Sequence, residues 1–86
     1  MKYFFCQITE VNGGIEYTSA FLIKCESDDE AVEKYDSVLL GYRGDGERGD
    51  DGFIWYPDCL AAIDDGDYKE ITKSDYDVMS KYITAL

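Results

Sequence analysis

The stretch ITEVNGGIEYT, residues 8–18, places Asn-Gly-Gly between two runs that are rich in aromatic and β-branched residues. An Asn-Gly pair in this setting predicts a β-hairpin, because a type I′ turn needs positive φ at both central residues. The two runs cover residues 2 to about 11 and 15 to about 26. The chain is therefore expected to begin with one long antiparallel hairpin.

The register of this hairpin decides which side chains lie opposite one another. A turn at Asn12-Gly13 places Cys6 opposite Ser19, whereas a shift of one residue places Cys6 opposite Phe21. Both registers bring the same apolar residues to one face, which we expect to be the core: Phe4, Cys6, Ile8, Ile15, Tyr17, Phe21 and Ile23. The other face is mixed and carries an apolar patch of Tyr3, Phe5 and Leu22.

Two helices are predicted from capping sequences that precede apolar residues at helical spacing. SDDE, residues 27–30, is a capping box, in which a serine hydroxyl and a glutamate satisfy backbone amides of the first turn. This helix continues to about Leu40 and ends at Gly41, a residue type favoured beyond helix C-termini. TKSD, residues 72–75, is a second N-terminal cap. The expected buried residues are Ala31, Val32, Tyr35, Val38 and Leu39 in the first helix, and Tyr76, Val78, Met79, Tyr82 and Ile83 in the second.

The segment between the helices predicts a loop and a second hairpin. Residues 41–52 contain five of the eight glycines, which is typical of a loop. In FIWYPD, residues 53–58, Pro57 argues against a central strand, and we expect an irregular or edge segment that lays Trp55 on the core. CLAAI and YKEI flank DDGD, residues 64–67, and predict a hairpin with a four-residue loop.

The predicted elements follow the order ββαββα over residues 1–86, a length that suits a single domain. The simplest arrangement of such elements is an antiparallel sheet with both helices packed on one face. We therefore expect a two-layer α+β domain, with a strand order that the sequence does not determine.

The segment GDGERG, residues 44–49, matches the dinucleotide-binding pattern G-x-G-x-x-G letter by letter. That chemistry requires a strand before the pattern and a helix after it, so that helix amides meet the pyrophosphate. Here a helix precedes the pattern, and the carboxylates in and after it would repel phosphate. An EF-hand starting at Asp45 is also excluded, because Asp50 stands where the loop needs glycine. We expect no cofactor and no defined metal site, although loose binding of divalent cations by clustered acids stays open.

The residue types for nucleophilic and metal chemistry are scarce. The chain has no histidine, which removes imidazole bases and the usual zinc sets. Its three cysteines form no C-x-x-C pair; Cys6 and Cys25 fall on strand positions and are expected in the core, while Cys59 adjoins a loop with no neighbouring base. Carboxylate pairs or Cys59 leave a small enzyme as a third alternative, but we expect no catalytic residues.

The charge of the chain is strongly one-sided. The chain has nineteen acidic residues and only eight lysines and arginines, for a formal net charge of -11. Such a field repels nucleic acid and anionic membranes and attracts basic protein surfaces. The first residues, MKYFFCQITEV, lack the long apolar run of a signal peptide, and no run reaches transmembrane length. We therefore expect a cytoplasmic protein whose partner is a basic protein or nucleoprotein complex, with no direct binding of nucleic acid or membrane.

The acidic residues are grouped, and carboxylates such as Asp29, Glu33 and Asp36 recur along one helix face at spacings close to those of alternate phosphates. The candidate apolar or aromatic anchors are Tyr42 and Trp55, near the loop, and the patch of Tyr3, Phe5 and Leu22. The candidate contact residues are Asp28, Asp29, Glu30, Glu33, Asp36, Tyr42, Asp45, Glu47, Asp50, Asp51, Trp55, Asp64, Asp65 and Asp67. The alternative is a small interaction domain, or a homodimer through the mixed sheet face, whose acidity serves only solubility.

In size, charge, absence of histidine and acidic runs such as ESDDEAVEKYD and DDGD, the chain resembles the small acidic inhibitors of phages and mobile elements. These include anti-CRISPR, anti-restriction and DNA-mimic proteins, which have many unrelated folds. The resemblance implies inhibition, in the host cytoplasm, of a nucleic-acid-handling complex whose binding surface is occupied by charge mimicry or blocked sterically. It assigns no role to any single residue.

Overall fold

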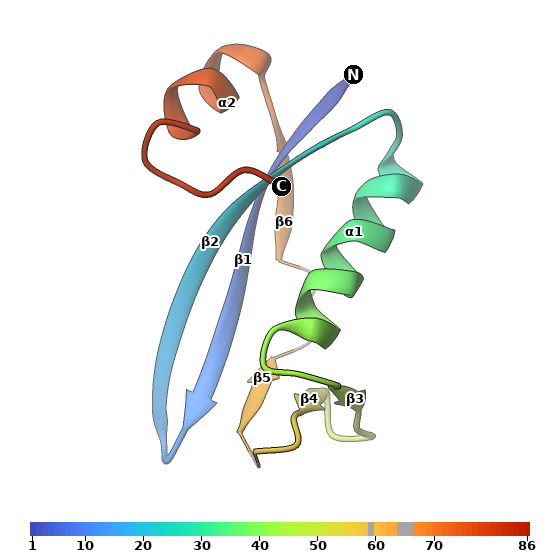
Figure 1. Cartoon of the computed structure of the whole chain (residues 1–86), viewed down its shortest axis with the longest axis vertical. Coiled ribbons are helices and arrows are strands. Elements are labelled where there is room, and N and C mark those ends of the chain that lie inside the picture. Colours follow the sequence, from blue (N-terminus) through green and yellow to red (C-terminus); the bar gives the residue numbers. More distant parts are fainter. Residues whose placement is uncertain (59, 64–66) are drawn as a thin grey trace.

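The structure of the chain is a computed structural model that describes residues 1–58, 60–63 and 67–86 (Figure 1). Within these residues a six-stranded sheet has the order β2-β1-β5-β4-β3, with β6 also paired to β1. All of the strand pairings are antiparallel. This confirms the α+β class with an antiparallel sheet and two helices. The elements are β1 (Lys2–Asn12), β2 (Ile15–Cys25), α1 (Asp28–Gly41), β3 (Glu47–Arg48), β4 (Phe53–Trp55), β5 (Ala61–Ile63), β6 (Tyr68–Ile71) and α2 (Lys73–Met79).

The β1–β2 hairpin adopts the second of the two predicted registers. Cys6 pairs with Phe21, and Asn12 pairs with Ile15. The turn residues are therefore Gly13 and Gly14, with φ of 59° and 84°. A turn at Asn12-Gly13 is wrong, because the two glycines reach positive φ without the steric cost that a side chain brings.

The main core lies between α1 and one face of this hairpin. The predicted cap is confirmed, because the Ser27 hydroxyl accepts a hydrogen bond from the backbone amide of Glu30 at 3.2 Å. The Glu30 carboxylate accepts from the amide of Glu26 at 3.1 Å, one residue before the expected partner. The buried residues of the core cluster are Ala31, Tyr35 and Leu39 from α1, Phe4, Cys6, Ile8, Phe21, Ile23 and Cys25 from the hairpin, and Ile54, Tyr56 and Ala62 from the later part of the sheet. Val38 packs at the edge of this cluster, and Val32, expected inside, is exposed.

The predicted core face is covered along only part of the hairpin. Ile15 and Tyr17 were expected in the core, but they are 56% and 52% exposed. The core cluster takes only Phe21, Ile23 and Cys25 from β2. The half of β2 next to the turn therefore extends past the core.

The two helices lie on opposite faces of the hairpin, which corrects the expectation of one shared face (Figure 1). The Tyr76 ring of α2 contacts the Tyr3 ring at 4.8 Å between centroids, while Phe4 belongs to the α1 core. Successive side chains of a strand point to opposite faces, so α2 covers the face that α1 leaves free. The physical reason is the apolar patch of Tyr3, Phe5 and Leu22 on that face, because these side chains are more stable when they are shielded from water.

The C-terminal tail completes this second layer. The Leu22 amide donates to the carbonyl of Thr84 at 2.9 Å, and the Leu86 amide donates to the carbonyl of Leu22 at 2.8 Å. Leu22 is fully buried, so the patch of Tyr3, Phe5 and Leu22 is not the free contact surface that the sequence suggested. The predicted cap of α2 is confirmed at Thr72. The helix ends at Met79, so its expected apolar side is only partly correct: Val78 and Tyr82 are exposed.

The predicted second hairpin is wrong, because β5 and β6 both pair with β1 instead of with each other. Ala61 lies opposite Val11, and Tyr68 lies opposite Cys6. The long β1 strand offers its second edge to both segments in succession. Of the predicted hairpin loop, residues 64–67, only Asp67 is among the described residues, and Cys59 lies outside them as well.

The glycine-rich segment and FIWYPD also differ from expectation. β3 pairs with β4, and β4 pairs with β5, so β4 is an internal strand and Pro57 lies beyond its end. The segment after α1, which was expected to be a loop, thus forms a β-hairpin. Strand alternation buries Ile54 and Tyr56 and leaves Trp55 46% exposed, the opposite of the predicted placement.

Candidate partner-binding surface

The β3–β4 hairpin is held by a glycine and by backbone pairing. A Cβ at Gly46 would lie 2.7 Å from the Leu40 carbonyl oxygen and 2.8 Å from Ile54 Cγ2, so only glycine lets the chain pass this close to the end of α1. The Gly46 amide donates to that same carbonyl at 2.7 Å. In the turn of the hairpin, the Gly49 amide donates to the Phe53 carbonyl at 2.8 Å. The hairpin is therefore fixed to α1 and to the sheet.

A surface hollow of about 290 Å³ opens at the base of this hairpin. Its lining consists of Asp45, Glu47, Trp55, Tyr56 and Pro57. Glu47 and Trp55 lie opposite each other in the β3–β4 pairing. The indole Nε1 of Trp55 donates to the Asp51 carboxylate at 3.1 Å, and this carboxylate also accepts from the Phe53 amide at 3.1 Å. Asp51 thereby orients the Trp55 ring beside the two acids.

The hollow combines the features that bind a cationic side chain. Asp45 and Glu47 are exposed, and neither takes part in an ion pair with any of the described residues. Carboxylates accept charge-assisted hydrogen bonds from guanidinium and ammonium groups. A tryptophan face attracts the same cations through its quadrupole. A lysine or arginine of a partner would find both contacts in one place.

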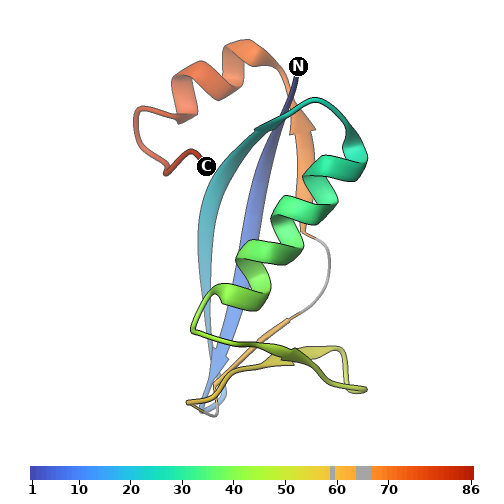
Figure 2. The ribbon, with the colours of Figure 1, turned by 45° about the vertical axis from the view of Figure 1, so that its right-hand side comes forward.

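Arg48 links the hairpin to the acidic face of α1. Its guanidinium lies 3.1 Å from the Asp36 carboxylate. Figure 2 shows the β3–β4 hairpin beside the C-terminal end of α1. Asp29 and Glu33 are exposed on the same helix, and Asp50 is exposed in the hairpin turn. We call the acids of α1 and of the hairpin, together with the exposed tryptophan, the acidic surface: Asp29, Glu33, Asp36, Asp45, Glu47, Asp50, Asp51 and Trp55.

Several other acids are neutralised within the chain. Asp28 pairs with Lys2 at 2.9 Å, and Glu30 pairs with Lys34 at 3.4 Å. Hydrogen bonding to the Glu26 amide, with a smaller contribution from Lys34, lowers the pKa of Glu30. Asp28 and Glu30, both predicted contact residues, thus form ion pairs with lysines of the chain itself near the N-terminal end of α1.

Arg43 joins β1 to the turn after β4. Its guanidinium contacts the Glu10 carboxylate at 2.7 Å and the Asp58 carboxylate at 2.9 Å. The hydrogen bond from Arg43, followed by that from the Leu60 amide, lowers the pKa of Asp58. These contacts fix the chain on both sides of the hollow, because Asp58 follows Pro57 directly.

The remaining predicted contact residues do not join the acidic surface. Tyr42 is half-buried; its hydroxyl shares a hydrogen bond with Ser19 at 2.9 Å, and its ring packs edge-on against Tyr56. Asp67 is exposed just before β6, and its carbonyl accepts from the Gln7 amide at 2.8 Å. Asp64 and Asp65 lie outside the described residues.

Sequence reasoning missed the hairpin, and with it the hollow and the role of Pro57 in its lining. One signal was present: Gly49-Asp50-Asp51-Gly52 separates ER from FIW and has the composition of a four-residue hairpin loop. Gly52 indeed has a φ of 82°. Two-residue strands carry too little hydrophobic pattern to be predicted, so the link between Arg48 and Asp36 had no sequence signal.

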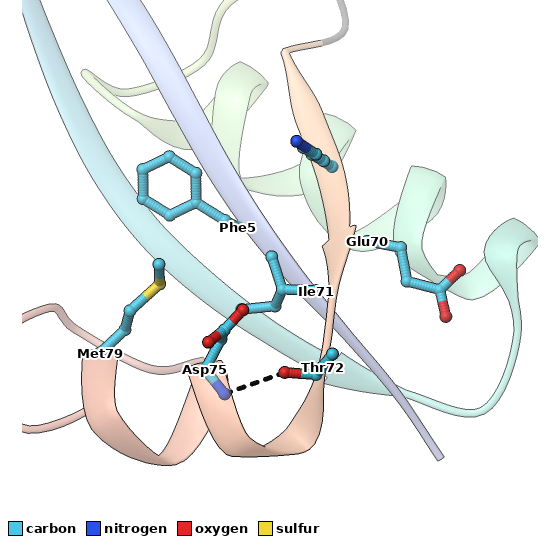
Figure 3. A pocket seen from close by; sticks show the side chains of 7 residues that line it. Phe5, Glu70, Ile71, Thr72, Asp75 and Met79 are labelled. Carbon is cyan, nitrogen blue, oxygen red and sulfur yellow. Dashed lines mark hydrogen bonds between the residues drawn. The ribbon is translucent and has the colours of Figure 1, made fainter.

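A second hollow, of about 640 Å³, lies between β6 and α2 (Figure 3). The side chains of Phe5 and Met79 approach it from β1 and α2, and Thr72 Oγ1 accepts from the Asp75 amide at 3.1 Å at its border. The remaining lining residues are Lys69, Glu70 and Ile71. Its one lysine and two carboxylates lie on β6 and α2, not on α1 or the β3–β4 hairpin, so this hollow is not part of the acidic surface.

Other chemistry finds little support in the part of the chain that the structure describes. Cys6 and Cys25 are buried free cysteines, and burial raises the pKa of the Cys6 thiol to about 12, which keeps it protonated. No group of three or more acidic or cysteine side chains that could hold a metal ion is found among the described residues. The described helices include none with the length and apolarity needed to span a bilayer.

A comparison of the chain with protein families, curated proteins and solved structures found no match.

Proposed function

We propose that the chain is a non-catalytic inhibitor that binds a basic, nucleic-acid-handling protein or complex and occupies its nucleic-acid-binding surface. The observation that carries this proposal is the hollow in which Asp45 and Glu47 stand beside the exposed face of Trp55. A net charge of -11 supports attraction to such a partner.

The acidic surface contributes to binding in two ways: its charges attract the partner, and Trp55 anchors it. Carboxylates on α1 and on the hairpin raise the rate of encounter with a basic partner, and this effect weakens with salt. Charge alone gives little affinity, so a stable complex needs a desolvated anchor. Trp55 supplies that anchor, because it is large, half-exposed and oriented by Asp51.

The cation-binding step can be tested with a hexa-arginine peptide. Trp55 is the only tryptophan of the chain, so its fluorescence reports directly on the hollow. The double variant Asp45→Asn with Glu47→Gln should lower affinity for the peptide about tenfold, which corresponds to about 1.4 kcal/mol. The matched control Asp67→Asn with Asp75→Asn removes the same charge from exposed positions elsewhere and should have a much smaller effect. Equal losses in the two double variants would show that only overall charge matters.

The inhibitory function is tested by capture of partners from a host lysate at low and high salt. We expect a basic nucleic-acid-binding protein that is released by salt, retained by the control variant and lost with Trp55→Ala. Purified partner should then bind either its nucleic acid or this chain, but not both together. Simultaneous binding of the two would refute occupation of the nucleic-acid site, and acidity for solubility alone would become the better explanation.

A further inference from the structure

The outer edge of β2 is open along the half that lies next to the hairpin turn. β2 is the last strand on its side of the sheet, and the C-terminal tail pairs with it only at Leu22. Between Ile15 and Ala20 no strand or tail residue of the described chain pairs with this edge, and Figure 1 shows no element beside it. An unpaired strand edge is a template for another strand.

The tail reveals which backbone groups face outward. The amide of Leu22 donates to Thr84 and its carbonyl accepts from Leu86, so both groups of Leu22 point away from β1. In an antiparallel pair the direction of these groups alternates from residue to residue. Glu16, Thr18 and Ala20 share the parity of Leu22, and their amides and carbonyls therefore point to the open edge.

This edge lacks the usual protection against pairing. Natural edges are blunted by lysine, proline, bulges or short length. Residues 15–20, IEYTSA, contain no lysine and no proline, and the register of β1 with β2 runs without a bulge. On the other side the sheet ends in β3, which is only two residues long, and in the four-residue β6, which carries Lys69. The two edges thus differ in length and in what shields them.

We propose that the open edge of β2 pairs antiparallel with the same edge of a second copy of this chain, about a twofold axis at Thr18. Thr18 then lies opposite Thr18 of the second copy, and Glu16 lies opposite Ala20 of the second copy. Residues of this parity form pairs that exchange two backbone hydrogen bonds each. The two sheets become one continuous sheet.

Charge favours this edge over other surfaces for contact between two copies. Each chain carries -11, so most surfaces of two copies repel one another. Glu16 is the single charged residue between Ile15 and Ala20. The twofold pairing keeps the two Glu16 side chains apart, because each faces an alanine.

The pairing also covers the apolar residues that the fold leaves exposed. Ile15 and Tyr17 are 56% and 52% exposed on the α1 face, where core cover begins only at Phe21. In the proposed register Tyr17 lies opposite Ser19 of the second copy, and Ile15 lies at the end of the paired segment, next to the tail that pairs with Leu22 of the second copy. The uncovered halves of the two hairpins thus lie side by side, as an isologous interface requires.

The oligomeric state and its register can be tested separately. Sedimentation equilibrium from micromolar to millimolar concentration should detect a monomer–dimer equilibrium. Thr18→Cys should crosslink to itself under mild oxidation, because paired Cα atoms in this position are about 5.5 Å apart, a distance suited to a disulfide. Glu16→Cys is the matched control: its two copies would be roughly 13 Å apart, at about 3.3 Å per residue, and should not crosslink. The wild-type chain controls for the native cysteines.

Thr18→Pro supplies a backbone test, because it removes an amide that points outward and leaves the β1–β2 hydrogen bonds intact. We expect it to raise the dimer dissociation constant at least tenfold. If proline unfolds the chain, the comparison of crosslinking in Thr18→Cys and Glu16→Cys still tests the proposal. A chain that stays monomeric overturns the proposal and leaves the edge to a strand of another protein. Equal crosslinking of the two cysteine variants, or a folded Thr18→Pro chain that dimerises normally, overturns it too. The hexa-arginine assay is independent, because Thr18 lies outside the acidic surface.

Discussion

The contact of α1 with the sheet and the β3–β4 hairpin differ in how much of their side-chain surface is apolar and buried. Tyr35 and Leu39 are almost completely buried among the apolar side chains of β1 and β2. The hairpin contributes Ile54 to the same core, whereas its strands are held together by backbone pairing, Gly46 permits its close approach to α1, and its Trp55 faces solvent beside Asp51. Burial of apolar surface dominates folding free energy, whereas exposed charges contribute little to it. Stability and binding are therefore expected to respond to substitutions in different regions.

The largest effect is expected in the α1 core. Tyr35→Ala should destabilise the fold by about 3–5 kcal/mol, as is typical for loss of a buried aromatic side chain. The ring is 1% exposed and packs against Phe21 and Tyr68 at 6.0 and 5.1 Å between centroids. A small domain has a total stability of only about 5–15 kcal/mol. Urea denaturation should therefore show a large fall in the midpoint.

Tyr35→Phe is the matched control for this substitution. It keeps the ring and removes the hydroxyl, which donates to the Gln7 carbonyl at 2.8 Å. The loss should be about 1 kcal/mol, the usual contribution of one hydrogen bond. If the two variants are equally destabilised, the hydroxyl and not the packing of the ring holds α1 on the sheet.

A smaller effect is expected where the hairpin approaches α1. Gly46→Ala should cost about 1–3 kcal/mol, because the new methyl overlaps the Leu40 carbonyl, Ile54 and Tyr56 at 2.7–2.9 Å and the neighbours must shift. Thermal unfolding measures the loss, and reduced binding of hexa-arginine would show that the hollow is displaced as well.

Gly41→Ala provides the comparison at the end of the same helix. A Cβ at Gly41 meets no atom within 4 Å, and alanine is the better helix former by about 1 kcal/mol. This variant should be as stable as the wild type or more stable. Equal destabilisation at both positions would mean that flexibility of the glycines, and not the close approach at Gly46, determines the position of the hairpin.

The comparison of these regions also explains what the sequence could predict. The β1–β2 hairpin and α1 were predictable, because an Asn-Gly-Gly turn, a capping box at Ser27 and long periodic apolar runs all carry strong local signals. The choice between the two registers depended on whether Gly14 joined the turn, which local pattern alone left open.

The parts that could not be predicted depend on contacts between distant segments. Whether residues 61–63 and 68–71 pair with each other or along β1 is decided by the free edge of β1, which no local pattern describes. Similarly, Trp55 was expected inside because it is large and apolar, but the pairing of β4 with β5 turns Ile54 inward instead. The acidic clusters of the candidate site were visible in the sequence, but the ion pair of Arg48 with Asp36, which joins the hairpin to α1, was not.

The smallest effect concerns the ion pairs beside the hollow, and it should appear only as a dependence on pH. The hydrogen bond from Arg43 holds the pKa of Asp58 below its ordinary value of 3.8. Because the folded chain prefers the ionised carboxylate, wild type should be more stable than Asp58→Asn above that ordinary value. This advantage should disappear as the pH falls through the lowered pKa of the folded state.

Asparagine keeps an acceptor for the Leu60 amide, so the variant isolates the charge. Glu33→Gln removes one charge but none of the described ion pairs, and corrects for general repulsion. If melting temperatures show the same advantage from neutral pH to pH values well below the pKa, the contact of Arg43 with Asp58 does not stabilise the chain around the hollow, and the hairpin contacts alone must hold it.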